Sequence, residues 1–404
     1  MVKYKEIKAI AAYVLLFAVV IAAVRIFFYH ELLNSSNFLY WDAEHYQWIK
    51  EKGYEGYRIA FFPLFPLIWR WLSVGVYGIV VVNSIVFLSA FYLMAKDLKL
   101  SVTEILVYLS IPGFIFFFLP FSESFFFLIS AVLLYGLKYS KVYFVCAALL
   151  LSAMSRPAFT IFIPAILITE LLSSNRANLL QRLGLYFACF SAGILFVGIV
   201  QYMDTGEWFR FFAVQKGWGN TLQWPKLPLT SWAGGFVVRL DGVAFFVGIL
   251  AGAFLTAVLL KLKFIRNITV PAEVIFSLAY LGGITLSVLI FRGGSLFSLN
   301  RFIFATPFIV VVFDFWIKQA FYPGRKQLLY IFGGILLFWF LFGSYVHIQA
   351  FLKFLLLTLY VFLLFVMKSD QPVLRKTATG LLILVNLIFQ VILYVRFLNG
   401  GWVG

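Results

Sequence analysis

Residues 10–29 have the sequence IAAYVLLFAVVIAAVRIFFY, which is apolar throughout except for Arg25. A helix needs about 20 such residues to cross the hydrocarbon core of a bilayer. The run follows Lys3, Lys5 and Lys8, and no small-residue cleavage site comes after it. We therefore interpret it as a retained membrane-spanning helix rather than as a signal peptide.

Similar apolar runs continue to the other end of the chain, and about thirteen of them are long enough or nearly long enough to span. They centre near Val20, Ile85, Tyr108, Leu128, Ala148, Ile163, Gly193, Leu250, Leu281, Val310, Leu337, Thr358 and Val385. The predicted fold class is an all-α polytopic membrane protein, and we treat residues 1–404 as one transmembrane domain.

The composition agrees with this prediction. Hydrophobic residues make up 63% of the chain and charged residues 12%, whereas an ordinary soluble domain is roughly 45–50% apolar. The formal net charge of +16 does not indicate nucleic acid, because the basic residues lie singly or in small groups between apolar runs. Membrane lipids are the expected surroundings.

Prolines interrupt the runs between residues 102 and 172. Pro112, Pro120, Pro157 and Pro164 lie within or between short apolar segments, and proline breaks or kinks a helix. We expect broken helices, pairs of short helices or re-entrant segments there, so this block is where the helix number is least determined.

Orientation follows from the basic connections, because cytoplasmic loops collect Lys and Arg. An N-terminus on the cytoplasmic side makes every inner connection basic: Lys3/Lys5/Lys8, Lys96/Lys99, Lys138/Lys141, Arg176/Arg182, Lys261/Lys263/Arg266, Lys318/Arg325/Lys326 and Lys368/Arg375/Lys376. The opposite face then receives the two longest polar stretches. We delimit these as a first outer loop at 30–73, with interfacial helices, and a second at 203–235, ahead of C-terminal helices at 327–404.

The densest polar cluster lies in the first outer loop, where residues 41–46 read WDAEHY. If Asp42 opens a helix that runs to about Lys52, Asp42 and His45 share a face while Glu44 points elsewhere. A carboxylate at a membrane surface is costly unless it is solvated or functional. The structural alternative is that Asp42 caps the helix and that Glu44 and His45 are merely exposed to water.

Further charged candidates are predicted on the same face. Glu123 follows Ser122 at a helix start, where simple capping is an equally good interpretation. Arg156, Arg292 and Arg301 can each extend to the lipid headgroups, which is the default for one arginine near a helix end. Three arginines that converge can instead hold a phosphate.

Several classes of protein are disfavoured by what the sequence lacks. It has no phosphate-binding GK[ST] loop, no dinucleotide-binding glycine motif and no HExxH zinc motif, which argues against nucleotide-driven pumps and zinc proteases. Cys146 and Cys189 both lie inside apolar runs and indicate no disulfide framework.

The order of the motifs resembles that of the PIG-V family, which comprises the second mannosyltransferase of GPI-anchor synthesis and its prokaryotic relatives within the GT-C class. The resemblance is specific from Trp41 to Pro66 and looser as far as Pro307. It rests on WDAEHY at 41–46, GY at 53–54, AFFPLFP at 60–66, FSES at 121–124, SR at 155–156 and Arg301 ahead of Pro307.

The resemblance implies a GT-C-type fold and an inverting transfer of a sugar, with mannose as the favoured candidate. The donor would be a polyprenyl- or dolichyl-phosphate sugar, and the acceptor a lipid-linked or glycan molecule on the non-cytoplasmic face. Asp42 would be the general base and Glu44 the second acid of a modified Asp-x-Asp pattern. The expected substrate-binding residues are His45, Glu123, Arg156, Arg292 and Arg301, with no metal and no other cofactor. The short loops suggest a prokaryotic plasma membrane, or the luminal side of the ER membrane if the chain is eukaryotic.

Two other classes stay open at this point. A polytopic transporter or lipid flippase should show interrupted helices in two corresponding halves and ionisable groups near the middle of the membrane, whereas here the charges cluster at the predicted outer surface. In a scaffold or receptor, the cluster at residues 41–46 would be incidental.

Overall fold

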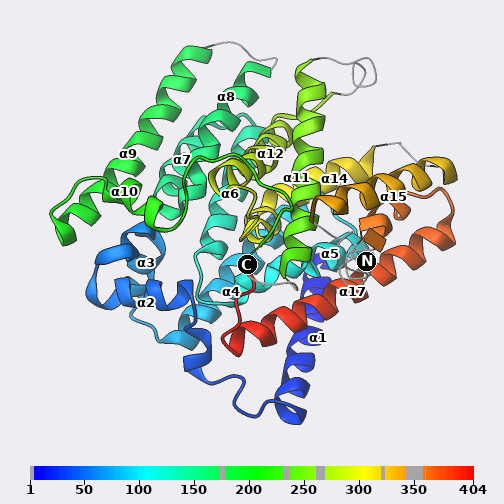
Figure 1. Ribbon diagram of the computed structural model, residues 1–404, viewed down its shortest axis with the longest axis horizontal. Helices are drawn as coiled ribbons and strands as arrows, with labels where there is room; N and C mark the ends of the chain where they lie inside the picture. The colour runs from blue at the N-terminus through cyan, green and yellow to red at the C-terminus, as the bar shows by residue number, and fades with distance from the viewer. Residues whose placement is uncertain are drawn as a thin grey trace.

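The computed structural model describes residues 4–172, 178–231, 237–260, 269–319, 324–342, 358–359 and 361–404 (Figure 1). These residues form helices joined by turns, and the isolated bridge between Thr230 and Ser295 is the β-pairing within them. The α-helices are α1 (Lys5–Phe27), α2 (Asp42–Lys52), α3 (Leu64–Leu72), α4 (Val76–Asp97), α5 (Val102–Leu109), α6 (Glu123–Lys138), α7 (Val142–Ser155), α8 (Phe162–Leu172), α9 (Leu179–Thr205), α10 (Arg210–Gly217), α11 (Val237–Leu259), α12 (Ala272–Phe291), α13 (Leu299–Phe304), α14 (Pro307–Lys318), α15 (Arg325–Trp339) and α17 (Pro372–Leu398). The 3₁₀ segments are η1 (Ser35–Phe38), η2 (Gly56–Ala60), η3 (Pro112–Phe118), η4 (Pro157–Ile161) and η5 (Phe340–Phe342).

Among the described residues, seven helices are long and apolar enough to cross a membrane, which confirms the prediction of a polytopic membrane protein. They are α1, α4, α9, α11, α12, α17 and the continuous segment Arg325–Phe342. The number rises to eight if η3 and α6 form one bent span. Other predicted runs coincide with shorter helices, and the run near Thr358 lies largely outside the described residues, so thirteen spans remain a prediction.

The predicted breaks are present around Pro112, Pro120 and Pro157, whereas Pro164 lies in the first turn of the continuous helix α8, where its missing N–H needs no partner. Helix α5 ends at Leu109, before Pro112 opens η3, and η3 meets α6 at an angle of 109°. In the same way α7 ends at Ser155, ahead of Pro157, and α8 resumes at Phe162. Since proline lacks the N–H that a continuing helix needs, each break leaves a turn at one end of the helices. Two of these turns carry Glu123 and Arg156.

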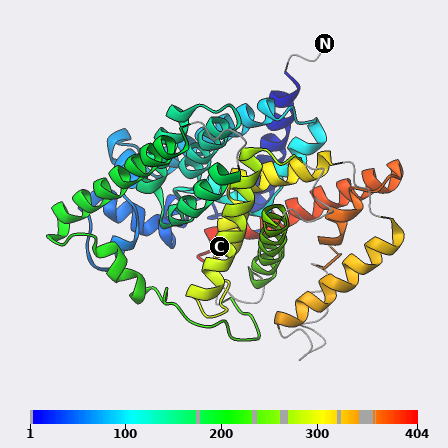
Figure 2. The same ribbon diagram turned by 90° about the horizontal axis from the view of Figure 1, so that it is seen from above.

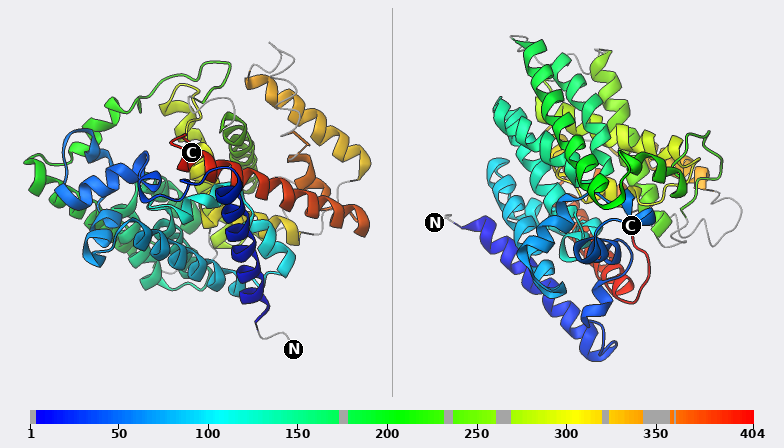
Figure 3. Two further views of the ribbon diagram at one scale, coloured as in Figure 1. Left: turned by 90° about the horizontal axis from the view of Figure 1, so that it is seen from below. Right: turned by 90° about the vertical axis from the view of Figure 1, so that its left-hand side faces the viewer.

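Helix α1 lies along an edge of the bundle (Figure 3, dark blue). Its side chains Leu15, Val19 and Ile26 are 65%, 57% and 60% exposed. Leaving such side chains in water costs roughly 1.5–3 kcal/mol each relative to burial. A helix with so apolar an exposed face is stable when lipid covers it.

The two ends of the bundle differ in their polar contacts. At one end, residues of predicted cytoplasmic connections meet: the Lys138 ammonium lies 2.7 Å from an Asp97 carboxylate oxygen, and Lys318 donates to the Leu98 carbonyl at 2.9 Å. Helix α6 begins at Glu123 and ends at Lys138, and its length is about 24 Å at 1.5 Å per residue. The motifs at Asp42, Glu123, Arg156 and Arg301 therefore gather at the opposite end.

The two outer stretches lie beside each other at that opposite end. Helices α2 and α3 (blue) lie next to α10 and the end of α9 (green) in Figures 1 and 2. The Tyr54 backbone N–H donates to the Asp204 carboxylate at 2.8 Å, which joins the first stretch to the second. Of the predicted second outer loop, residues 232–235 lie outside the described residues, as do Lys3, Arg176, Lys261, Lys263 and Arg266 of the predicted inner connections.

Candidate functional site

Helix α2 places the first acid. It begins at Asp42 and ends at Lys52, as the sequence predicts. Trp41 precedes it with φ at 59°, a left-handed value that few residues other than glycine adopt, and this sharp entry turns Asp42 toward the bundle. Gly53 ends the helix at φ 84°, and a Cβ there would lie 2.7 Å from an Asp204 carboxylate oxygen. This position therefore requires glycine.

Four charged side chains from four separate segments form an ion-pair cluster. Arg301 Nη1 of α13 lies 2.5 Å from Asp42 Oδ2, and Arg301 Nε pairs with Glu123 Oε1 at the start of α6. The same Glu123 oxygen lies 2.8 Å from Arg156 Nη1, at the end of α7. We call these four residues the Asp42–Arg156 cluster. It contains two acids and two arginines, so its formal charge is zero.

Burial makes this cluster different from surface ion pairs. Glu123 is fully buried, Arg156 and Arg301 are 6% and 4% exposed, and the Asp42 side chain keeps 20% of its surface open. Removing charges from water is costly, and that cost is offset here because each charge meets an opposite one. The pKa of Arg301 is raised, since Glu123 and Asp42 together outweigh the burial that lowers it. The guanidinium therefore stays charged at any physiological pH.

Aromatic rings enclose both arginines. The Arg301 guanidinium lies 4.7 Å from the centre of the Phe121 ring, and that of Arg156 lies 5.3 Å from the centre of the Phe302 ring. These arginines are thus held inside the protein, and the alternative that they extend to the headgroups is wrong for Arg156 and Arg301. Cations packed on rings keep a fixed position while their unused N–H groups remain donors.

The capping alternatives are not what the contacts show. Asp42 is the first residue of α2 rather than its cap, and its carboxylate pairs with Arg301. Ser122 does precede α6, but no side-chain capping bond is made there. Its hydroxyl instead lies 2.9 Å from the Tyr46 hydroxyl. Sequence reasoning did not single out Tyr46, although the residue closes the WDAEHY motif.

Glu44 and His45 lie away from the arginines. Glu44 is exposed, and its side chain has no hydrogen bond or ion pair with the described residues. The His45 ring lies among Tyr57, Phe61 and Trp218, with centroid distances of 5.5, 4.9 and 6.1 Å. Burial lowers the pKa of His45, against the opposing effect of Asp42 and Glu44, so the imidazole is neutral at pH 7.

Arg292 does not join the cluster, contrary to the expectation of three converging arginines. Its Nε donates to Asn220 Oδ1 at 3.0 Å, and its Nη1 donates to the Phe297 carbonyl. It is the residue that follows α12, so its side chain reaches the polar segment after α10 instead. We assign Arg292 to holding the second outer stretch in place.

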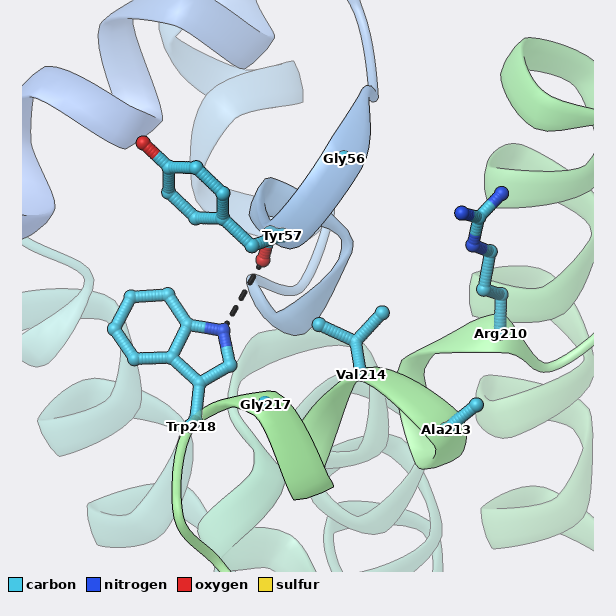
Figure 4. Close-up of a pocket in the computed structure, with 7 residues that line it drawn as sticks. All are labelled: Gly56, Tyr57, Arg210, Ala213, Val214, Gly217 and Trp218. Carbon is cyan, nitrogen blue, oxygen red and sulfur yellow. Dashed lines mark hydrogen bonds between the residues drawn. The ribbon is translucent and has the colours of Figure 1, made fainter.

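A cavity of about 500 Å³ opens between η2 and α10 (Figure 4). It is lined by Gly56, Tyr57, Arg210, Ala213, Val214, Gly217 and Trp218. Tyr57 and Trp218 also contact His45, which lies one helical turn after Asp42. The cavity thus adjoins the helix that carries the candidate base.

The segment after α17 supports the site and was not predicted from sequence. Trp41 Nε1 donates to the Gly400 carbonyl at 3.1 Å, and the Trp41 and Trp402 rings lie 5.2 Å apart. A Cβ on Gly404 would lie 3.2 Å from Arg301 Cδ, so this segment also packs on the cluster. The only signal in the sequence is a tryptophan after two glycines, which is too common to identify such a contact.

No group of three or more His, Cys, Asp and Glu side chains among the described residues is arranged to hold a metal ion. The cluster offers arginine N–H donors and carboxylates, which suit an anion and a proton transfer. Comparison of the chain with models of protein families, with curated proteins and with solved structures finds no significant match.

Proposed function

We propose that this protein is an inverting membrane glycosyltransferase of the GT-C type. It would move a sugar from a polyprenyl- or dolichyl-phosphate donor to a lipid-linked or glycan acceptor on the non-cytoplasmic face. Mannose is the favoured candidate for this sugar. The observation that carries the proposal is the buried ion-pair cluster, in which Arg301 joins the partly exposed Asp42 to Glu123 and Arg156. The Asp42 carboxylate suits removal of a proton from a sugar hydroxyl, and the two arginines suit stabilisation of a departing phosphate.

Asp42 is the proposed general base. Its Oδ2 is bound to Arg301, while its Oδ1 has no hydrogen bond with the described residues and the side chain is partly open. A sugar hydroxyl is a poor nucleophile, and a carboxylate within hydrogen-bond reach accelerates its attack by accepting the proton. The contact with Arg301 fixes the direction of the Asp42 carboxylate. Glu44 is exposed, and we propose it as the second acid on the basis of the family resemblance alone.

The arginines would stabilise the leaving group. As the acceptor oxygen bonds to the anomeric carbon, the bond from that carbon to the phosphate oxygen breaks, and the lipid phosphate leaves with the electron pair. The ion pairs of the cluster use one N–H group of Arg156 and two of Arg301, out of five on each guanidinium. The remaining donors can meet the developing charge. Attack opposite the leaving group converts a β-linked donor sugar into an α-linked product.

Unpaired polar atoms beside the cluster support a polar ligand there. Glu123 Oε2 and the hydroxyls of Ser155 and Tyr280 are buried without a hydrogen-bond partner among the described residues. Ser155 precedes Arg156, and Tyr280 is close enough to interact electrostatically with Arg156 and Glu123. Buried polar atoms are rarely left without a partner, so a bound molecule or water is expected to satisfy them.

The test uses the full chain in lipid nanodiscs with radiolabelled polyprenyl-phosphate mannose and a membrane lipid extract. We expect the wild type to transfer label, Asp42→Asn to lower the rate by about 10²–10⁴-fold, and product analysis to show inversion. Glu51→Gln, on the same helix but exposed, is the matched control and keeps the rate. Equal circular dichroism and elution volume establish that each variant folds. No transfer by the wild type, or full activity in Asp42→Asn, rejects the proposal.

A further inference from the structure

The cavity between η2 and α10 has the features of a ligand site, and none of its lining residues belongs to the ion-pair cluster. Its volume of about 500 Å³ falls within the range of small-molecule pockets, roughly 300–1,000 Å³. Tyr57 and Trp218 are 54% and 42% exposed although both rings contact His45. Aromatic rings that keep open faces beside a cavity favour a partner with an apolar face of its own.

The opposite wall carries one polar side chain beside Ala213 and Val214. Arg210 lies across the cavity from Tyr57 and Trp218 in Figure 4. Its Nη1 lies 2.8 Å from the exposed Glu207 carboxylate, so its charge is already paired. A hydrocarbon chain in the cavity would take water from that guanidinium and return no hydrogen bond. The Arg210–Glu207 pair has no net charge to attract a further anion, so this wall favours a neutral ligand that carries hydroxyl groups.

The backbone is open to such a ligand. A Cβ added to Gly56 or Gly217 would meet no atom within 4 Å, so both main chains border empty space. The indole N–H of Trp218 donates to the Tyr57 backbone carbonyl at 3.2 Å, and this bond holds the two aromatic residues beside each other. The cavity is therefore held by contacts between the two outer stretches and is not a gap between mobile side chains.

We infer that this cavity seats the sugar of the acceptor, a neutral pyranose that stacks on Tyr57 and Trp218 and bonds through its hydroxyls to Arg210. The inference rests on the proposed transfer for its assignment to the acceptor. One pyranose face presents C–H groups and its rim presents hydroxyls, which match aromatic faces and an arginine. The rings that line the cavity touch His45, and His45 lies one turn from Asp42. An acceptor anchored here extends toward the base.

The test fills the cavity without touching the cluster. Gly217 ends α10 without a left-handed φ, so Gly217→Phe places a ring in the empty space without backbone strain. Gly184→Phe is the matched control, because Gly184 in α9 also borders open space and lies in no part of the cavity. Trp218→Ala is a second variant that removes one stacking face and leaves the volume open.

Calorimetry in nanodiscs then measures binding of octyl α-mannoside below its micelle concentration, with 1-octanol as the tail control. We expect saturable binding of the mannoside and none of octanol, at least about tenfold weaker binding in Gly217→Phe and Trp218→Ala, and no change in Gly184→Phe. Absence of binding by the wild type, or equal binding by Gly217→Phe and Gly184→Phe, overturns the site.

Transfer kinetics separate the two possible sources of the sugar. Gly217→Phe should raise the KM for acceptor and leave the KM for donor unchanged, whereas a raised donor KM rejects the acceptor assignment. The binding measurement needs no turnover. If the wild type binds mannoside but transfers nothing, the proposed reaction fails and the saccharide site stands.

Discussion

Glu123 is the residue on which both buried arginines depend. One of its oxygens accepts from Arg301 and from Arg156, and the side chain has no exposed surface. Its charge therefore compensates two cations that the protein has removed from water. Removing one member of a buried ion pair leaves an uncompensated charge, which is far more costly than losing an exposed pair.

Glu123→Gln should destabilise the protein by about 3–5 kcal/mol, because it leaves Arg156 and Arg301 short of one negative charge. Glu55→Gln is the control, since Glu55 pairs with Arg58 at 3.2 Å while 59% exposed, and exposed pairs contribute about 0–1 kcal/mol. Unfolding followed by tryptophan fluorescence in detergent measures both. Similar midpoints for the two variants would show that the cluster contributes little to stability.

Helix α13 is the element that positions Arg301. It has only six residues, and Ser298 enters it at φ 65°. Asp241 of α11 is fully buried and accepts from the Asn300 backbone N–H and from its side-chain amide, both at 2.9 Å. So short a helix has little stability of its own, and these two bonds fix its first turn.

Asp241→Ala should lower the rate of transfer by about 10²-fold, because a displacement of the order of 1 Å in Arg301 moves it from its partners. Asp241→Asn keeps an acceptor oxygen and should restore most of the rate, with KM for donor and acceptor near the wild-type values. The measurement is kcat and KM for the three proteins in nanodiscs. An Asp241→Asn protein as impaired as Asp241→Ala would show that charge, rather than positioning, is what Asp241 supplies.

The elements of this protein differ in how far the sequence predicts them. The helix from Asp42 to Lys52 and the breaks around Pro112 and Pro157 follow from capping-type positions, turn residues and missing N–H groups, which are local properties. Arg301 pairs with Asp42, which lies 259 positions earlier in the chain, and no local sequence pattern predicts a contact between residues so far apart. The alternation of basic connections predicted Asp42, Glu123, Arg156 and Arg301 at one end, but the expectation that Arg292 converges with the other arginines is wrong, because Arg292 bonds to Asn220 instead.

At the scale of the whole molecule, the charged groups separate into two ends. The pair between Lys138 and Asp97 marks one end, and the Asp42–Arg156 cluster marks the other. Because short basic connections are retained in the cytoplasm, we propose that the end with Lys138 faces the cytosol. The cluster and the cavity then face the periplasm, the extracellular space or the lumen.

Cysteine labelling in intact cells tests this orientation. After Cys146 and Cys189 are replaced by alanine, Glu51→Cys should react with a membrane-impermeant maleimide, while Lys141→Cys should react only after the membrane is permeabilised. Both positions are exposed, so burial does not explain a difference between them. The reverse pattern would place the cluster in the cytoplasm and exclude a donor presented on the outer face.

The hydrogen bond from Trp41 to the Gly400 carbonyl joins residues 359 positions apart. Trp41 directly precedes Asp42, so the entry to α2 is supported by a segment that the ribosome makes hundreds of residues later. While the intervening helices are being inserted, Asp42 is without this support. The entry to α2 therefore acquires this contact only after residue 400 has been synthesised, which sets an order for completion of the fold.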